Sequence, residues 1–160
     1  MSETPNRFRL RPPGPGDYAR LCEWIPDGPA ARRWAGPEIP WPLDGPELAL
    51  ALYREYAHPR ALVDETGALV AFGEYYFKPP ATVRFARLIV APNRRGQRLI
   101  DALITLLAAD ANRHRTSDTL ELAVFADNRA AVRAYDRLGF VALANTIHTP
   151  ILTLQRAPFD

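Results

Sequence analysis

A basic turn in the second half of the chain has the pattern of an anion-binding site. It lies within Leu88–Ile100, where an apolar strand leads into a turn and then into a long apolar helix. The free backbone N–H groups of a helix start, together with the helix dipole, attract anions. Arg94, Arg95 and Arg98 add guanidinium groups at the same point, and these suit phosphate. The segment predicts a pyrophosphate site, and a solvated basic cap on an ordinary helix is the alternative.

A second segment, residues 128–140, has the pattern of a capped helix that directly follows a strand. Asn128 is a suitable N-cap residue, and Gly139 ends the helix. Ala131 and Tyr135 lie one turn apart on one helix face. The order and separation of the two segments favour a shared function, and an N-capped helix with a core tyrosine is the alternative.

Together the two segments resemble the GNAT superfamily of N-acetyltransferases, most strongly over residues 85–140. The helix pattern is similar to the family's second cofactor segment, and the run Arg95–Gln97 resembles its pyrophosphate loop. The resemblance implies acetyl-CoA as the cofactor and direct attack of an amine on its thioester, without a covalent acyl-enzyme. The residues that it assigns to the cofactor are Leu88, Ile89, Val90, Arg94, Arg95, Gly96, Gln97, Arg98, Leu99, Ile100, Asn128 and Tyr135.

The chain departs from the family pattern at Arg98 and Ile100, where GNAT proteins usually have Gly, and Gly or Ala. Glycines there let the backbone approach phosphate and let the helix pack closely on the sheet. The side chain of Arg98 either forces the phosphate outward or contacts it directly. N–H groups remain at residues 96–99 in both cases, so we still expect an anion site.

The resemblance also implies roles in the reaction. The strand edge at Leu88–Val90 would supply a backbone N–H group to the oxyanion. Tyr135 matches the family's catalytic donor to the leaving thiolate. Because the ordinary pKa is about 10 for tyrosine and about 8.5 for a thiol, a strong hydrogen bond is expected rather than complete proton transfer.

Glu74 is the candidate catalytic base that would take the proton of the amine. If Lys78–Ala81 closes a hairpin, Glu74 lies opposite Phe85 and one diagonal step from Arg87. Two roles stay open for Glu74: a general base, or one half of a structural ion pair with Arg87. Glu121 is a second candidate base, although the alternation of its strand could equally turn it to solvent.

The acceptor site has two candidate contacts. Arg87 could bind a substrate carboxylate. Trp34 lies in the stretch 26–46, which is rich in Pro and Gly and is of the kind that often forms binding loops. Core packing is the alternative for Trp34. The acceptor, a small molecule or a peptide, stays open among peptide N-termini, protein lysines, polyamines, aminoglycosides and amino acids.

The order of the expected elements predicts how these segments are held. Antiparallel strands come first, then a strand–helix–strand–helix unit, then two closing strands. We therefore expect an α/β (α+β) fold with a mixed, mostly antiparallel sheet of about 6–7 strands, flanked by about four helices, in one domain over residues 1–160. The expected strands are Phe8–Arg11, Arg60–Asp64, Leu69–Phe77, Thr82–Val90, Thr119–Phe125, Phe140–Ala144 and Ile151–Gln155, and the expected helices are Tyr18–Ile25, Pro46–Tyr56, Arg95–His114 and Asn128–Leu138.

The composition narrows the class of protein. A net charge of +2 is too small to indicate nucleic acid. Cys22 is the only cysteine, so no intrachain disulfide forms, and no Cys/His cluster of metal-site spacing is present. The first residues lack the apolar core of a signal peptide. We expect a cytoplasmic protein without a metal and without nucleic-acid or membrane partners.

Two rival functions remain open. The first is a non-catalytic acyl-CoA-binding or regulatory domain of the same fold, which Arg98 and Ile100 support. The second is a small nucleic-acid-binding module, although the aromatic residues are not interleaved with basic residues on one strand face. The final strands could also pair between subunits, so a homodimer is a further expectation.

Overall fold

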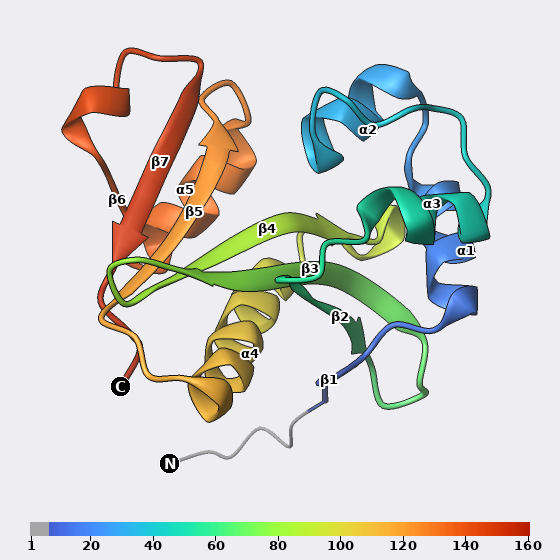
Figure 1. Cartoon of the computed structure of the whole chain (residues 1–160), viewed down its shortest axis with the longest axis horizontal. Helices are drawn as coiled ribbons and strands as arrows, with labels where there is room; N and C mark the ends of the chain where they lie inside the picture. Colours follow the sequence, from blue (N-terminus) through green and yellow to red (C-terminus); the bar gives the residue numbers. More distant parts are fainter. Residues whose placement is uncertain (1–6) are drawn as a thin grey trace.

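A seven-stranded sheet with helices on both faces is formed by residues 7–160, the part of the chain that the computed structural model describes (Figure 1). The strand order is β1-β2-β3-β4-β5-β7-β6, and only β4 and β5 pair in parallel. The expected mixed, mostly antiparallel sheet is confirmed, with five α-helices rather than four among the described residues. The elements are β1 Arg9–Arg11, α1 Pro15–Trp24, α2 Gly28–Ala35, α3 Gly45–Leu52, β2 His58–Val63, β3 Leu69–Lys78, β4 Thr82–Val90, α4 Leu99–His114, β5 Thr119–Phe125, α5 Arg129–Arg137, β6 Val141–Ala142 and β7 Ile151–Arg156.

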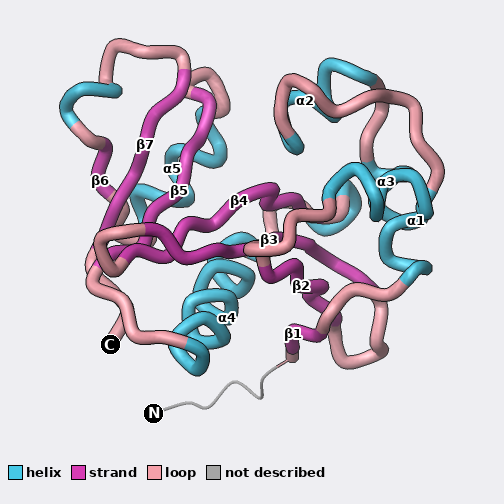
Figure 2. The backbone as a smooth tube through the Cα atoms, in the orientation of Figure 1, coloured by secondary structure: helices cyan, strands magenta, loops and turns pink. Residues whose placement is uncertain are grey.

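Strand β3 lies between two apolar clusters and contributes side chains to both. Tyr75 packs in the cluster that includes α4, and Phe72 packs in the cluster formed with α1, α2 and α3. Figure 2 shows α4 on one face of the sheet and α1–α3 on the other. Gly73 faces α4, where a Cβ atom would lie 2.6 Å from Cδ2 of Leu88. The absence of a side chain at Gly73 therefore lets Leu88 pack between the sheet and α4.

Two helices near the site differ from the expected elements. Helix α2 has eight residues, where the sequence indicated a stretch of the binding-loop kind. The side chain of Asp27 caps this helix by accepting from the backbone N–H of Ala30 at 2.9 Å. Helix α4 begins at Leu99 rather than Arg95, because Gly96 and Arg98 have φ values of 80° and 57°. Those left-handed conformations cannot continue a right-handed helix.

None of the helices in residues 7–160 combines the length and the apolar character needed to cross a bilayer.

Strands β4 and β5 pair only at their first residues and then separate. Their register covers Thr82–Arg84 on β4 and Thr119–Glu121 on β5, while β4 continues to Val90 and β5 to Phe125. In Figure 1, β5 and β7 turn away from β3 and β4. The separation leaves space between the carboxyl ends of two adjacent parallel strands, where α/β sheets commonly bind ligands.

The last paired position holds a buried carboxylate with three partners. Glu121 accepts hydrogen bonds from Arg84 at 2.6 Å, Lys78 at 2.8 Å and Gln155 at 2.8 Å. Burial alone would raise the pKa of Glu121, but these bonds outweigh it and lower the pKa from 4.5 to about 2. The cluster joins β3, β4, β5 and β7 at the point where the sheet begins to separate.

Replacing Glu121 by glutamine should lower the free energy of unfolding at pH 7 by about 2 kcal/mol. The folded-state pKa is depressed, so this stabilisation is complete above the unfolded-state value of 4.5 and is lost as the pH falls toward 2. Urea unfolding at pH 7 and at pH 3 should therefore show a gap between wild type and Glu121→Gln that narrows in acid. Glu38→Gln, at an exposed carboxylate, is the control. A gap of equal size at both pH values would contradict the prediction.

Candidate functional site

Two adjoining cavities lie where β4 and β5 separate. The larger, of about 720 Å³, is lined by the end of β4, the following turn, the first turn of α4, and α5. The smaller, of about 360 Å³, is lined by the end of α1, α2, the second half of β4 and the end of β5. The residues that line both cavities, and so form their junction, are Leu88, Ile89, Arg95, Asn128, Ala131 and Tyr135.

The wall of the larger cavity carries a positive charge. Arg95, Arg98 and Arg133 line it, and their exposed side chains have no ion-pair partner within residues 7–160. Arg94 also lines it but is paired with Asp64 at 3.1 Å. Several free guanidinium groups around one cavity suit a ligand with more than one negative charge.

Helix α4 begins at the same cavity and offers uncapped backbone amides. Its N-cap residue, Arg98, makes no side-chain cap bond, so the first N–H groups of the helix remain available to a ligand. The φ value of 57° gives Arg98 the backbone conformation that a glycine adopts without cost. Ile100 lines the cavity and also packs against the core cluster. The two departures from the GNAT pattern therefore leave the cavity open.

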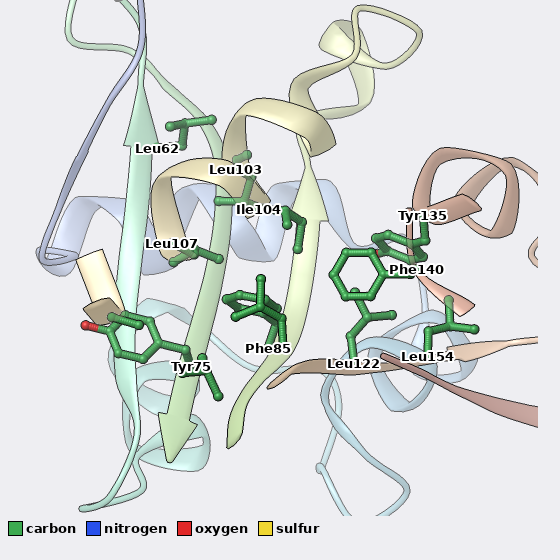
Figure 3. Close-up of a cluster of buried hydrophobic side chains, with 14 of the residues drawn as sticks. Leu62, Tyr75, Phe85, Leu103, Ile104, Leu107, Leu122, Tyr135, Phe140 and Leu154 are labelled. Atoms are coloured by element: carbon green, nitrogen blue, oxygen red, sulfur yellow. The ribbon is translucent and has the colours of Figure 1, made fainter. Parts of the chain in front are cut away.

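Tyr135 lies at the junction of the two cavities. Helix α5 positions it, and the side chain of Asn128 caps that helix by accepting from the backbone N–H of Ala131 at 3.3 Å. The ring of Tyr135 packs edge-on against Phe140, with 6.1 Å between ring centroids (Figure 3). The residue is only 5% exposed, and burial raises the pKa of the phenol above its ordinary value of 10. Burial is the cause of this shift, with no contribution from a hydrogen bond to a described residue, so the phenol is a neutral donor that a ligand could use.

A bulge in β4 brings backbone groups to the same junction. Between two paired positions, β4 has one residue more than β3, and Arg87 at this point has a φ value of 54°. The carbonyl oxygen of Arg87 accepts a hydrogen bond from Nε1 of Trp34 at 2.7 Å, which ties α2 to the bulge. Leu88 is the next residue and lines both cavities. The bulge therefore exposes the backbone of β4 to a ligand at the junction.

Glu74 is enclosed in an ion-pair cluster and lines neither cavity. Its side chain is 2% exposed, contacts the guanidinium group of Arg54 and lies 3.4 Å from Nη1 of Arg87. Arg87 also donates a hydrogen bond to the carbonyl oxygen of Leu52 at 2.7 Å. The partners enclose the carboxylate, so an amine in either cavity does not reach it directly. The surroundings of Glu74 favour the structural ion pair over the general base.

The register around Glu74 differs from the expected one. Ala86 rather than Phe85 lies opposite Glu74, because the turn between β3 and β4 contains only residues 79–81. A regular strand in this register would turn Arg87 to the other face of the sheet, and the bulge turns it back toward Glu74. The second candidate base, Glu121, lines neither cavity and is held by its three partners.

The structure gathers the predicted residues in two groups. Trp34 and Arg87 line the smaller cavity, whereas Gln97 lines neither and bonds to Arg94 at 2.9 Å. The other predicted cofactor residues all line the larger cavity: Leu88, Ile89, Val90, Arg94, Arg95, Gly96, Arg98, Leu99, Ile100, Asn128 and Tyr135.

Several lining residues were missed by the sequence analysis, among them one arginine of α5 and three large side chains of the smaller cavity. Arg133 is two residues from both Ala131 and Tyr135 on α5, so helical spacing does not place it on their face. It lies instead between Ala130 and Arg137, which also line the larger cavity. Trp24, Arg33 and Phe125 line the smaller cavity. They come from three elements that meet only in the folded chain, and no local pattern marks them.

The chain matches a known family in sequence and known enzymes in structure. A sequence model of the Acetyltransferase (GNAT) family matches residues 28–140. The chain is similar in structure to a spermidine N-acetyltransferase from Vibrio cholerae, solved with CoA and spermine, with a TM-score of 0.76, 17% identity and 96% of each chain covered. It is also similar to an aminoglycoside acetyltransferase solved with coenzyme A and kanamycin, with a TM-score of 0.69, 16% identity and 94% of each chain covered. At such identities these two likenesses show the shared fold.

Proposed function

The chain belongs to the acetyltransferase (GNAT) family, and from this premise we propose that it transfers an acetyl group from acetyl-CoA to a primary amine by direct attack. The observation that carries the proposal is the pair of adjoining cavities that meet at Tyr135 and the bulge of β4. The larger cavity would hold the cofactor and the smaller would hold the amine. Their junction is the point at which the two reacting groups would meet.

The residues of the larger cavity fit a diphosphate-bearing cofactor. Arg95, Arg98 and Arg133 offer guanidinium groups that are free of ion pairs with the described residues, and the uncapped start of α4 offers backbone amides. When bound, the cofactor would supply an acetyl group activated as a thioester. Of the two outcomes expected for the side chain of Arg98, direct contact with the phosphate or displacement of the phosphate outward, we propose direct contact.

The reaction balances with the groups at the junction. The amine nitrogen bonds to the acetyl carbon, the C–S bond breaks, the amine loses one proton to solvent, and the leaving thiolate gains one. The phenol of Tyr135 would stabilise that thiolate by a hydrogen bond. The backbone N–H of Leu88, in the bulge, would stabilise the oxyanion. Solvent is the proposed proton acceptor because neither Glu74 nor Glu121 lines a cavity.

The acceptor is proposed only as a primary amine. The two structural neighbours are named for spermidine and for aminoglycosides, and both kinds of compound carry several amino groups. A cytoplasmic location is part of the same proposal, supported by the single cysteine of the chain. Pairing of the final strands between subunits stays a prediction, since β7 pairs here with β5 and β6 of its own chain.

A thiol-release assay with a panel of amines, together with calorimetry for coenzyme A, tests the proposal. We expect coenzyme A to bind and at least one amine to be acetylated. Arg133→Glu, which reverses a charge at the larger cavity, should weaken binding of coenzyme A about tenfold. Arg129→Glu, on the same helix but outside both cavities, should change it less than about twofold. Binding without turnover on any amine would support the non-catalytic alternative.

A further inference from the structure

The smaller cavity has a lining without carboxylates. Its charged lining residues are all basic: Arg33, Arg87 and Arg95. No Asp or Glu among residues 7–160 lines it, although the chain has 18 acidic residues in all. A site that binds a polyamine would need negative charge to replace the water around several ammonium groups. The lining of this cavity has the opposite sign.

Nearby carboxylates do not cancel this charge. Glu74 lies between two guanidinium groups, those of Arg54 and Arg87, so that cluster keeps one positive charge. Arg95 has no ion pair with a described residue, but the cofactor diphosphate proposed above would share its charge. Arg33 is paired with Asp127 at 2.7 Å, so that pair is neutral. The field in the cavity therefore favours an anionic group and opposes a polycation.

Arg33 is placed to receive such an anionic group. Its guanidinium group lies 4.2 Å from the centroid of the Phe125 ring. Only Nη2 donates to Asp127, and the other N–H groups of Arg33 make no hydrogen bond to a described residue. Arg87 is less available, because Nη1 already bonds to the carbonyl oxygen of Leu52. Arg95 lies at the junction with the larger cavity.

Apart from Asn128, the remaining side chains that line the smaller cavity are apolar or aromatic. Trp24, Ile25 and Trp34 line one side, and Val124 and Phe125 line the other. The indole N–H of Trp34 is already bonded to the backbone, so its ring offers an apolar surface. Such walls suit an apolar or aromatic side chain rather than a hydrated polar chain.

We propose that the acceptor is an apolar or aromatic α-amino acid, whose carboxylate binds Arg33 and whose side chain lies between the walls of the smaller cavity. This inference rests on the proposed function and specifies its substrate. The lack of a carboxylate in the lining agrees with it, because an α-amine loses its proton more readily than the amine of lysine.

Three probes separate the two parts of the inference: L-tryptophan, L-tryptophanamide and spermidine. The amide has the same ring as L-tryptophan and an amine that loses its proton at least as easily, but it lacks the carboxylate. We expect kcat/KM for L-tryptophan to exceed that for the amide by about tenfold and that for spermidine by about 100-fold. Equal or better use of the amide would overturn the carboxylate contact, and better use of spermidine would overturn the whole inference.

Two variants on α2 test whether Arg33 binds the carboxylate of the substrate. Arg33→Gln should lower kcat/KM for L-tryptophan about tenfold and leave that for the amide within about twofold. Arg32→Gln, at the exposed neighbouring arginine outside the cavity, should change neither value. Equal losses on both substrates for Arg33→Gln would show that Arg33 acts on the fold and would overturn its proposed role.

A binding measurement keeps the inference testable without turnover. In the presence of coenzyme A, N-acetyl-L-tryptophan should bind about tenfold more tightly than N-acetyl-L-tryptophanamide, and Arg33→Gln should remove the difference. If N-acetyl-L-tryptophan binds more tightly than its amide and no amine is acetylated, the proposed transfer fails while the ligand class stands. If amines are acetylated and the preference is absent, the ligand class fails while the transfer stands.

Discussion

Replacing Tyr135 by phenylalanine is expected to lower kcat about 100-fold and to leave the dissociation constant of coenzyme A within about twofold. The ring that packs on Phe140 is retained, and only the hydroxyl is removed. If the phenol stabilises the leaving thiolate, its loss affects the transition state and not the bound cofactor. Steady-state kinetics and calorimetry on the same preparations measure the two quantities.

The pH dependence sharpens this test. Burial raises the pKa of Tyr135 above 10, so the phenol stays protonated and the wild-type enzyme should keep this donor at pH 9.5. The ratio of wild-type to Tyr135→Phe turnover should therefore be constant between pH 7 and pH 9.5. Tyr53→Phe, at an exposed tyrosine, is the control. An unchanged kcat in Tyr135→Phe would remove the hydroxyl from the mechanism.

Local patterns predicted the elements that hold the cofactor side of the site. Strands β4 and β5 begin and end at the expected residues, because each is an apolar run bounded by turn residues. The larger cavity is built mainly from residues 88–100 and 128–137, two nearly continuous stretches. Its lining could therefore be predicted from motifs before the strand order was known.

The acceptor side depends on contacts between distant segments. Arg33 and Asp127 are 94 residues apart in the chain and meet only because β5 separates from β4 and α2 lies against the bulge. No periodicity connects such residues. Sequence reasoning accordingly found Trp34, which is conspicuous in a loop-like stretch, and missed the neighbouring arginine.

The Glu74–Arg87 pair shows how an expectation can hold for the wrong reason. The sequence placed the two residues on one face by a register that is one residue off. The true register would separate them, and the left-handed conformation of Arg87 brings them together again. A bulge at a non-glycine residue has no sequence signal, because its cost is repaid by tertiary contacts such as the Trp34 hydrogen bond.

Replacing Glu74 by glutamine is expected to lower the free energy of unfolding by about 4 kcal/mol, the loss typical of removing one partner from a buried ion pair. Arg54 and Arg87 would then face each other without a counterion, beside the Nε atom of Arg54, which already lacks a partner within the described residues. Urea unfolding measures the loss. Glu23→Gln, which breaks an exposed pair with Arg20, should cost less than about 1 kcal/mol.

The same variant separates the two roles left open for Glu74. A structural ion pair predicts that the protein that remains folded keeps kcat within about threefold, with the acidic limb of its pH profile unchanged. A general base predicts a loss of about 100-fold or more and a shifted acidic limb. Because no carboxylate lines the smaller cavity among the described residues, we expect the first result. Proton removal would then depend on the pKa of the acceptor itself, which links the charge of this cavity to the choice of substrate.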